Sequence, residues 1–518
     1  MSSKDKDNKK HSHKKHSRRI TKRKIFDKLN RLGDQLEEIE SFLRSGNFQG
    51  ATGFQGTTGF QGATGFQGAT GPQGATGPRG GIQGPPGIPD EQLGLKLVGQ
   101  PFTDKGQRQG FSVSLSANGG RLAIGAPGDN NIALAGATWI FRRVINGSNI
   151  TFEQEQRLVG SGAVVGQGTS VSLSDDGNTL AVGGPGQFGV SFGAVWIWVR
   201  NPETNVWTQQ QTLGDGVSGN LFGQSVSLSG DGNRVAVGSP GEGSEVIAPG
   251  GDPSDPDSPL PIFGSSGATR IYERIGQQWT LVDTLIGMGS IGLASQGQSV
   301  SLSPDGNTLA VGGPRDNTII IGDDDDREIN SAGATWIFER SNNGTWIQNA
   351  STPLRGSGGD QNSTQGTSVS LSGASPFGPI NTLAVGGPQD NEGIGATWIF
   401  IKSETTGLWT QQGEKLVGAG FRGAPLQGAS VSLSDDGDLL AIGGPQDLDP
   451  QNALRGAVWI FRRTGETWSQ LGEKLLGSDL NGTAAFGQSV SLSAFSPFTL
   501  AVGGPHDNLF VGATWIFI

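Results

Sequence analysis

A six-residue segment recurs seven times along most of this chain. It reads GATWIF at residues 136, 333, 395 and 512, with the variants GAVWIW at 193, GATRIY at 267 and GAVWIF at 456. A second segment, SVSLS, recurs with it and begins at Ser112, Ser170, Ser225, Ser299, Ser368, Ser430 and Ser489. Repeats of this kind are supersecondary units that bury their apolar faces against their neighbours. The spacing therefore predicts seven equivalent units packed in series.

Each unit contains four short segments of strand character. From residue 297 one unit reads GQSVSLSPDGNTLAVGGP, followed by a variable loop, a GATWIF segment and then a segment like GEKLVG. Short strands separated by glycine-rich turns are typical of a β-propeller, in which every four-stranded unit forms one blade. We therefore expect an all-β fold, a seven-bladed β-propeller, over residues 91–518.

The chemistry of the segments assigns their places in a blade. SVSLS alternates small polar and apolar residues, which suits an innermost strand near a crowded axis. Asp-Gly pairs then supply a tight hairpin into LAVGG, the second strand; they lie at Asp176-Gly177, Asp231-Gly232, Asp305-Gly306 and Asp436-Gly437. GATWIF is the third strand, and its tryptophans are expected to fill the space between blades. They are Trp139, Trp196, Trp336, Trp398, Trp459 and Trp515.

The fourth strands suggest how the ring closes. We expect them at EQRLVG (155–160), LVDTLIG (281–287), GEKLVG (413–418) and GEKLLG (472–477), whereas nothing follows the seventh GATWIF because the sequence ends at Ile518. One further copy, LGLKLVG at residues 93–99, precedes the first SVSLS. We expect it to be the outer strand of the seventh blade, which would leave the ring without an open edge.

These units resemble the FG-GAP repeats of integrin-like β-propellers. The resemblance rests on FGQSVSLSGDGNRVAVGSP (222–240) and FGQSVSLS (486–493), and it extends over roughly residues 91–518. Integrin-type blades often bind calcium through alternating aspartates in a hairpin loop, a pattern from which the turns here depart. The layout of the whole chain also looks like that of collagen-like surface proteins of large DNA viruses and bacterial spores, through GATGPQGATG (68–77) and the domain order.

Two segments before the repeats predict a trimer. Residues 25–45 carry apolar side chains at alternating spacings of four and three, as in a coiled coil; a lone helix packed on the propeller is the alternative. In residues 46–90, glycine occupies every third position from Gly50 to Gly80 and again from Gly81 to Gly87. Only glycine fits at the axis of a collagen triple helix, so we expect a stalk on the order of 120 Å long; the alternative is a flexible linker.

Residues 1–24 form a basic tail with a net charge of +9, which leaves −19 for the rest of the chain. Such a tail is either a solvated, disordered arm or an anchor to an anionic surface. The sequence has no cysteine, no apolar run long enough for a membrane span and no apolar core of a secretory signal. We therefore expect no disulfide, no membrane span and no export through a signal peptide.

Candidate metal ligands are few. The Asp-Gly segments are expected to be hairpin turns rather than calcium sites. Asp323 and Asp325, in the segment GDDDDRE at 322–328, would offer oxygen ligands to calcium, with a solvated acidic loop as the alternative. A recurring GPxD aspartate follows the second strand and is expected to shape a turn by bonding its own backbone; these residues are Asp129, Asp316, Asp390, Asp447 and Asp507. No cofactor is implied.

Enzyme chemistry has little support in the sequence. The propeller region holds one histidine, His506, and one tyrosine, Tyr272, and no nucleophile motif accompanies them. Long loops at 241–266 and 315–332 are instead placed where binding sites tend to form on rigid scaffolds. Our hypothesis is a non-enzymatic, homotrimeric protein of a virion, spore or cell surface, which binds a protein or glycan with its loops. The alternatives are a stalk-borne glycan-processing enzyme and a purely structural coat component.

Overall fold

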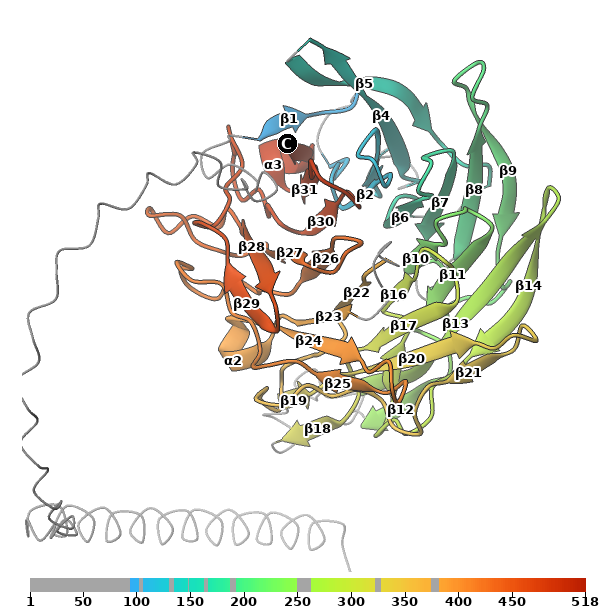
Figure 1. Ribbon diagram of the computed structural model, residues 1–518, viewed down its shortest axis with the longest axis vertical. Coiled ribbons are helices and arrows are strands. Elements are labelled where there is room, and N and C mark those ends of the chain that lie inside the picture. Colours follow the sequence, from blue (N-terminus) through green and yellow to red (C-terminus); the bar gives the residue numbers. More distant parts are fainter. Residues whose placement is uncertain are drawn as a thin grey trace, which may run out of the picture. The chain divides into compact units, whose positions relative to one another are not determined.

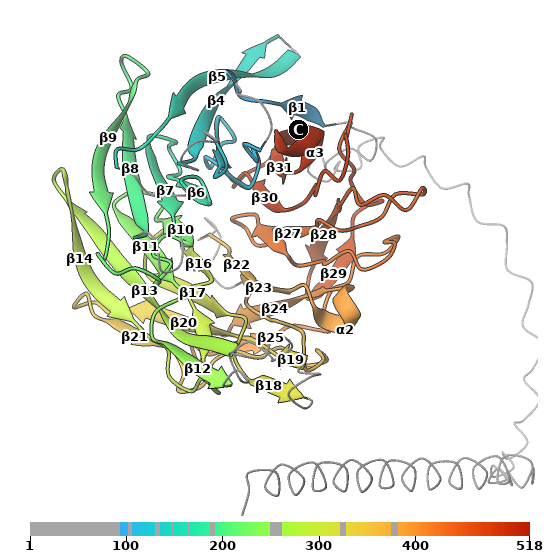
Figure 2. The same cartoon turned by 180° about the vertical axis from the view of Figure 1, so that it is seen from behind.

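The computed structural model of the protein describes residues 94–101, 106–129, 135–147, 149–162, 166–186, 192–248, 262–321, 328–373 and 382–518. Within them, seven β-sheets surround a common axis, as Figures 1 and 2 show from the two sides. The prediction of an all-β, seven-bladed β-propeller is confirmed. The predicted tail, coiled coil and Gly-X-Y stalk lie outside the described residues. No helix in these described ranges is long and apolar enough to cross a bilayer.

The four principal strands of each blade are antiparallel to their neighbours, and in blades 1 to 6 they follow the chain from the axis outward. Blades 1 to 3 contain β2 (Ser112–Leu115), β3 (Arg121–Ala126), β4 (Ala137–Asn146) and β5 (Asn149–Leu158); β6 (Ser170–Leu173), β7 (Thr179–Gly184), β8 (Ala194–Arg200) and β9 (Trp207–Leu213); and β10 (Ser225–Leu228), β11 (Arg234–Ser239), β13 (Ile262–Ile275) and β14 (Gln278–Leu285). Blade 3 is widened by β12 (Ser244–Ala248) and β15 (Ala294–Gln296), which both pair with β13.

Blades 4 to 7 repeat the same order. They contain β16 (Ser299–Leu302), β17 (Thr308–Gly313), β20 (Ala334–Arg340) and β21 (Trp346–Gln348); β22 (Ser368–Leu371), β23 (Thr382–Gly387), β24 (Ala396–Lys402) and β25 (Trp409–Gln411); β26 (Ser430–Leu433), β27 (Leu439–Gly444), β28 (Ala457–Thr464) and β29 (Thr467–Gln470); and β30 (Ser489–Leu492), β31 (Leu500–Gly504) and β32 (Ala513–Phe517). Between second and third strands lie the hairpin of β18 (Thr318–Ile321) and β19 (Glu328–Ser331) and the short helical turns α2 (Asp390–Gly393) and α3 (Asp507–Phe510).

The seventh blade takes its outer strand from the start of the propeller. Strand β1 (Leu95–Leu97) pairs antiparallel with β32, with Leu95 opposite Ile516 and Leu97 opposite Thr514. The prediction that LGLKLVG completes the last blade is confirmed. First and last strands of the ring are therefore hydrogen-bonded neighbours, and β32 has no unpaired edge.

The serines of the inner strands join neighbouring blades. Throughout the described ring, the first serine of each SVSLS segment donates to a glycine carbonyl that precedes the next inner strand, as Ser112 does to Gly168 at 2.9 Å. The second serine accepts the leucine N–H of the following blade, as Ser114 does from Leu173 at 3.0 Å. The small polar residues of this segment therefore form a belt of hydrogen bonds around the axis.

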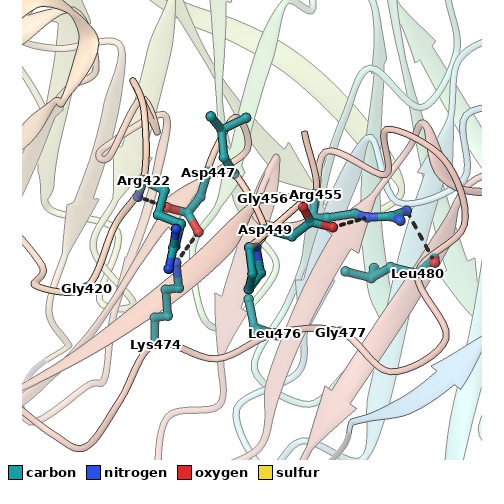
Figure 3. Close-up of a pocket in the computed structure, with 12 residues that line it drawn as sticks. Gly420, Arg422, Asp447, Asp449, Arg455, Gly456, Lys474, Leu476, Gly477 and Leu480 are labelled. Carbon is teal, nitrogen blue, oxygen red and sulfur yellow. Dashed lines mark hydrogen bonds and ion pairs between the residues drawn. The ribbon is translucent and has the colours of Figure 1, made fainter. Parts of the chain in front are cut away.

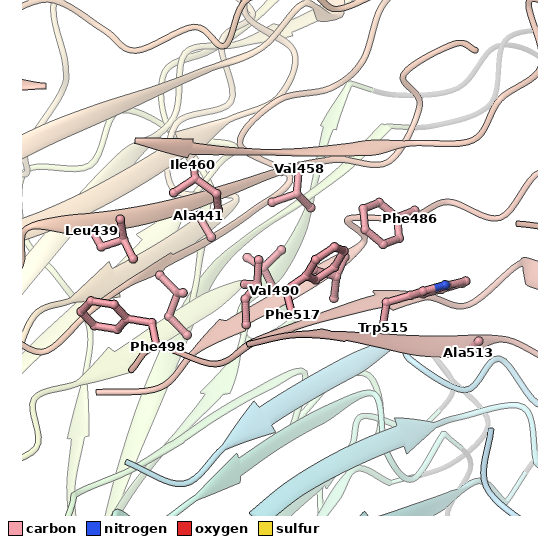
Figure 4. Packing of buried hydrophobic residues seen from close by; sticks show 13 residues of the cluster. Leu439, Ala441, Val458, Ile460, Phe486, Val490, Phe498, Ala513, Trp515 and Phe517 are labelled. Carbon is pink, nitrogen blue, oxygen red and sulfur yellow. The ribbon is translucent and has the colours of Figure 1, made fainter. Parts of the chain in front are cut away.

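The third-strand tryptophans lie between blades, as predicted. All of Trp139, Trp196, Trp336, Trp398, Trp459 and Trp515 are at most 1% exposed. Figure 4 shows one of these layers, where Val458 and Ile460 of blade 6 pack against Phe486, Val490 and Trp515 of blade 7. Full burial of such large side chains makes these layers the main apolar core of the ring.

The prediction for the fourth strands is only partly correct. In blades 1 and 3 the predicted segments overlap β5 and β14. In blades 5 and 6, however, β25 and β29 precede GEKLVG and GEKLLG, which contribute only isolated bridges, such as the one from Leu416 to Thr397. The residues just before each leucine leave the ladder as a bulge, and this divides the fourth strand into two short pieces.

Candidate functional site

The loops between second and third strands lie beside the connections between blades. Gly395, just before β24, forms a bridge with Gln427 in the connection to β26, and Gly136 and Gly333 make the same bridge to Gln167 and Gln365. Together these loops and connections form what we call the loop face. The hairpins between first and second strands lie at the other ends of the same antiparallel strands.

Buried ion pairs recur on the loop face. Within the described residues, each GPxD aspartate pairs with a basic residue from the outer part of the same blade. The pairs are Asp129–Arg157, Asp316–Arg355, Asp390–Lys415, Asp447–Lys474 and Asp507–Lys96. The side chains of these aspartates are at most 2% exposed. A buried carboxylate needs such a partner, because its desolvation is otherwise costly.

Among the described residues, the carboxylates of Asp316, Asp390, Asp447 and Asp507 accept no N–H group of their own turns, so that detail of the prediction was wrong for these four. Their carboxylates accept backbone N–H groups from the connection that enters the blade, for example from Asp360 to Asp390 at 2.9 Å and from Arg422 to Asp447 at 2.8 Å. The connection passes close to the loop and places its own N–H groups within reach. Each aspartate therefore ties together the loop, the entering connection and the outer strand of one blade.

Blade 3 replaces this arrangement with another. Its GATRIY segment has Arg270 where other blades have tryptophan, and Arg270 pairs with Glu242 at 2.8 Å and with Asp215 at 3.7 Å. The position before the outer leucine is basic in blades 1, 5, 6 and 7, and in blade 4 Arg355 supplies the cation two residues later; it is Thr284 here and Thr212 in blade 2. The charge pair is thus kept in blade 3 by moving the cation from the fourth strand to the third.

One pocket of about 330 Å³ opens on the loop face of blade 6. Figure 3 shows its lining, with Arg422 and Lys474 on one side and Asp449 and Arg455 on the other. The common pair of this blade, Asp447 and Lys474, contributes to its wall. A pocket of this volume lies at the small end of the range for small-molecule sites.

The loop of blade 6 that lines the pocket is longer than its equivalents in blades 1, 5 and 7. Ten residues run from Asp447 to Gly456, against six from Asp390 to Gly395 in blade 5. The extra residues fold back through hydrogen bonds from the N–H groups of Gln451 and Ala453 to Asp449, at 2.8 and 2.9 Å. The loop is therefore held in place by its own backbone bonds.

Asp449 also binds a neighbouring cation. Its carboxylate accepts a bond of 3.2 Å from Arg455, whose other nitrogen reaches the carbonyl of Leu480 at 3.4 Å. The hydrogen bond from the backbone of Ala453, together with the Arg455 contacts, lowers the pKa of Asp449 although burial acts in the opposite direction. The carboxylate therefore stays ionised at neutral pH.

Arg422 differs from the other cations of the pocket. Its backbone is fixed by the bond to Asp447, but among the described residues its guanidinium has no carboxylate or carbonyl partner, and the side chain is exposed. The equivalent residues are Ile291 in blade 4 and Asp360 in blade 5, whose N–H groups make the same bond to the loop aspartate. We call the shared ion pair and the backbone bond to its aspartate the common frame. Arg422 is thus a cation that blade 6 adds to the common frame.

The Asp-Gly segments are hairpin turns, as expected. Asp176 accepts bonds from the Ser174 hydroxyl at 2.6 Å and the Asn178 N–H at 2.9 Å, and Gly177 takes the left-handed conformation with φ of 65°. Burial raises the pKa of Asp176, but these bonds and the charge of Arg121 outweigh it and leave the pKa lowered. The carboxylate oxygens are occupied by donors of the turn itself.

Two aspartates beside these turns have raised pKa values. Burial is the main cause for both, and charges of nearby aspartates add to it. Burial, together with repulsion from Asp175 and Asp436, raises the pKa of Asp435 to about 6. A carboxyl group with such a pKa is partly protonated in mildly acidic solution.

The structure brings none of the other candidates from the sequence together within the residues that it describes. Asp323 and Asp325, the predicted calcium ligands, lie outside the described residues. In the part of the chain that is described, no three His, Asp or Glu side chains are grouped as metal ligands. His506 lies in blade 7 against Phe510, and Tyr272 lies in the core of blade 3. Burial lowers the pKa of His506, with the charge of Arg108 adding to the effect.

The residues of the pocket were missed at the sequence level, although a signal existed. Asp447 and Lys474 have counterparts in other blades, whereas Arg455 stands where blades 5 and 7 have Ile394 and Val511, and the ten residues from Asp447 to Gly456 compare with six in each of those blades. A residue that recurs in several blades is indicated to have a structural role, whereas a residue found in one blade only is indicated to have a role particular to that blade.

Comparisons with known proteins agree with this architecture. A family described as the FG-GAP repeat matches residues 207–251, which include Phe222 and Gly223 ahead of β10. No curated protein matches the sequence. Among solved structures, the periplasmic gluconolactonase of Pseudomonas aeruginosa is similar, with 15% identity and a TM-score of 0.43 over 73% of this chain and 92% of that chain. By its sheet order the chain is a seven-bladed β-propeller, and by the family match it contains an FG-GAP repeat.

Proposed function

We propose that this is a non-enzymatic surface or fibre protein, in which a trimeric stalk displays propellers that recognise a ligand with their loop faces. The observation that carries the proposal is that the blades differ more in the loops of the loop face than in the hairpins of the opposite face. On the other face, the hairpins of blades 1 to 4 and 6 keep one length, as in SDDGN at 174 and SGDGN at 229, and only those of blades 5 and 7 differ. Loops of the loop face range from a six-residue turn in blade 5 to the β12–β13 arm in blade 3.

Such a distribution suits recognition. Binding sites are often variable loops that a rigid scaffold holds in place. Here the scaffold is a ring closed by β1 and β32 and crossed by hydrogen bonds between all neighbouring inner strands in its described part. The pocket of blade 6 arises from one such loop.

The N-terminal sequence supports the remainder of the proposal. Glycine in strict third positions requires three chains, and the apolar seam of residues 25–45 would bring three chains together. The basic tail would anchor the trimer to an anionic layer of a particle or cell. Its net charge of +9 contrasts with −19 in the rest of the chain, so the tail and the propellers would prefer different surroundings.

The solution mass of the intact chain, measured by light scattering beside that of a chain beginning at Asp90, tests this proposal. We expect a trimer for the intact chain and a folded monomer for the shorter one. A monomer in both cases would refute the trimeric stalk. Binding of the intact protein to intact particles or cells, compared with a variant lacking residues 241–266, then tests recognition by the loop face.

A further inference from the structure

We propose that the pocket of blade 6 binds the carboxylate of an acidic sugar, with Arg422 as the residue that holds the carboxylate. This inference rests on the proposed role in recognition and gives it a ligand class. It starts from the comparison between blades, which separates the common frame of the pocket from the residues that are specific to it.

The common frame explains only part of the charge. Asp447 and Lys474 have equivalents in blades 1, 4, 5 and 7, so their pairing is accounted for by the fold. The residues particular to blade 6 are Arg422, Asp449 and Arg455, and the last two neutralise each other at 3.2 Å. Arg422 thus leaves the pocket with one positive charge in excess, on a region of the chain that is strongly acidic as a whole.

One excess charge favours a monoanion. A singly charged carboxylate would neutralise Arg422 through two parallel hydrogen bonds, a geometry that guanidinium groups favour. A doubly charged phosphate monoester would bring a second negative charge close to Asp447 and Asp449 and would be repelled. The charges of the pocket therefore favour a carboxylate over a phosphate.

The hydrogen-bonding groups around Arg422 suit hydroxyl groups. Lys474 has three N–H donors and uses one on Asp447, while the partly exposed Asp449 accepts three bonds out of the roughly four that a carboxylate can take. Donors and acceptors thus alternate along the wall. A hydroxyl group both donates and accepts, so a ligand with several hydroxyl groups can satisfy such a wall better than an apolar side chain of a protein partner can.

The size and the remaining lining fit one sugar ring. A volume of about 330 Å³ exceeds what a small inorganic anion needs and is too small for a long oligosaccharide. Leu448, Leu476 and Leu480 line the rest of the pocket and offer apolar contact to the C–H groups of a ring or to an acyl group. We therefore expect the pocket to hold one terminal or side-chain residue of a glycan.

The test is a titration of the intact protein with small glycosides, followed by calorimetry or ligand-observed NMR. The probes are the methyl glycosides of glucuronic, galacturonic and N-acetylneuraminic acids, with methyl glucoside as the neutral control and glucose 6-phosphate as the dianionic control. The variant Arg422→Gln removes the guanidinium. Arg142→Gln is its matched control, because Arg142 is an exposed arginine on the outer part of blade 1 and the change in net charge is the same.

We expect at least one acidic glycoside to bind, with affinity reduced roughly tenfold or more by Arg422→Gln and unchanged by Arg142→Gln. Equal binding of methyl glucoside, or of an acidic glycoside by Arg422→Gln, would overturn the assignment of Arg422. No binding of any acidic glycoside at millimolar concentration would overturn the ligand class. If the protein is still trimeric and still binds its particles or cells, that failure concerns the pocket alone and leaves the proposed function intact.

Discussion

The glycine that ends each LVG-type segment supports a tryptophan of the next blade, and this contact can be tested with one methyl group. A Cβ atom at Gly287 would lie 2.0 Å from Cδ1 and 2.4 Å from Cγ of Trp336. Trp336 is fully buried, and its Nε1 donates to the carbonyl of Met288 at 2.9 Å. Overpacking of this kind costs about 1–3 kcal/mol, and loss of the hydrogen bond adds about 1 kcal/mol. We expect Gly287→Ala to lower the free energy of unfolding by roughly 2–4 kcal/mol.

The ring contains its own control for this substitution. The counterpart of Gly287 before blade 3 is Asp215, where Arg270 replaces the tryptophan; Gly214, one position earlier, contacts no tryptophan, and the nearest atom to an added Cβ is the carbonyl oxygen of Gly193 at 3.6 Å. Gly214→Ala should therefore change stability by no more than about 0.5 kcal/mol. Urea unfolding followed by circular dichroism compares the two variants. Equal midpoints for Gly287→Ala, Gly214→Ala and the parent protein would refute the role assigned to the tryptophan contact.

Three further predictions concern charge and closure. Lys415→Met should cost about 3 kcal/mol of unfolding free energy, since it leaves Asp390 buried without its cation, and adding Asp390→Asn should restore part of the loss in a double-mutant cycle. The pKa of Asp435 is raised to about 6, so ionisation of this group lowers the free energy of unfolding as pH rises from about 4 to about 6. The variant Asp435→Asn should therefore be more stable than the parent at pH 7, by of the order of 1–2 kcal/mol, and equal to it near pH 4. Thermal unfolding measures this difference, and a difference that does not change between these pH values would contradict the assignment. A chain beginning at residue 100 lacks β1 and exposes the edge of β32, and it should aggregate or unfold at lower temperature than a chain beginning at residue 90, as size-exclusion chromatography and thermal scans would show.

The repeated features of the fold could be predicted from the sequence because their causes are local or periodic. Alternation in SVSLS, the Asp-Gly turns and the buried tryptophans each recur in the same order, and the unattached copy at 93–99 predicts the closing strand β1. The positions of the fourth strands were harder to predict from the sequence. A bulge such as the one before Leu416 depends on how the strand meets its neighbour, and the sequence pattern contains no separate signal for it.

The candidate site could be predicted much less well. Asp447 and Lys474 are far apart in the sequence of a blade but form an ion pair. Their pairing could have been predicted only by noting that repeats with the aspartate also have the basic residue, and that repeats without one also lack the other. The position of Arg422 beside them depends on the path of a connection between blades, which periodicity does not describe. Regular elements thus follow from the sequence pattern, whereas the pocket follows from tertiary contacts.

The belt of serine hydrogen bonds also has a consequence for how several copies of the chain could assemble. Each blade offers a hydroxyl donor to the next blade and an acceptor to that blade's leucine N–H, so one side of a blade complements the opposite side of any other. Contacts of this head-to-tail kind form a closed ring when the rotation per unit adds up to a full turn, and an open filament when it does not. The bonds of Ser489 to Gly110 and of Leu115 to Ser491 make the last such contact, between blades 7 and 1, within one chain. A variant that could not form it would keep two complementary open faces, and at high concentration its molecules would be expected to join end to end into polymers built from the same contacts that stabilise the ring.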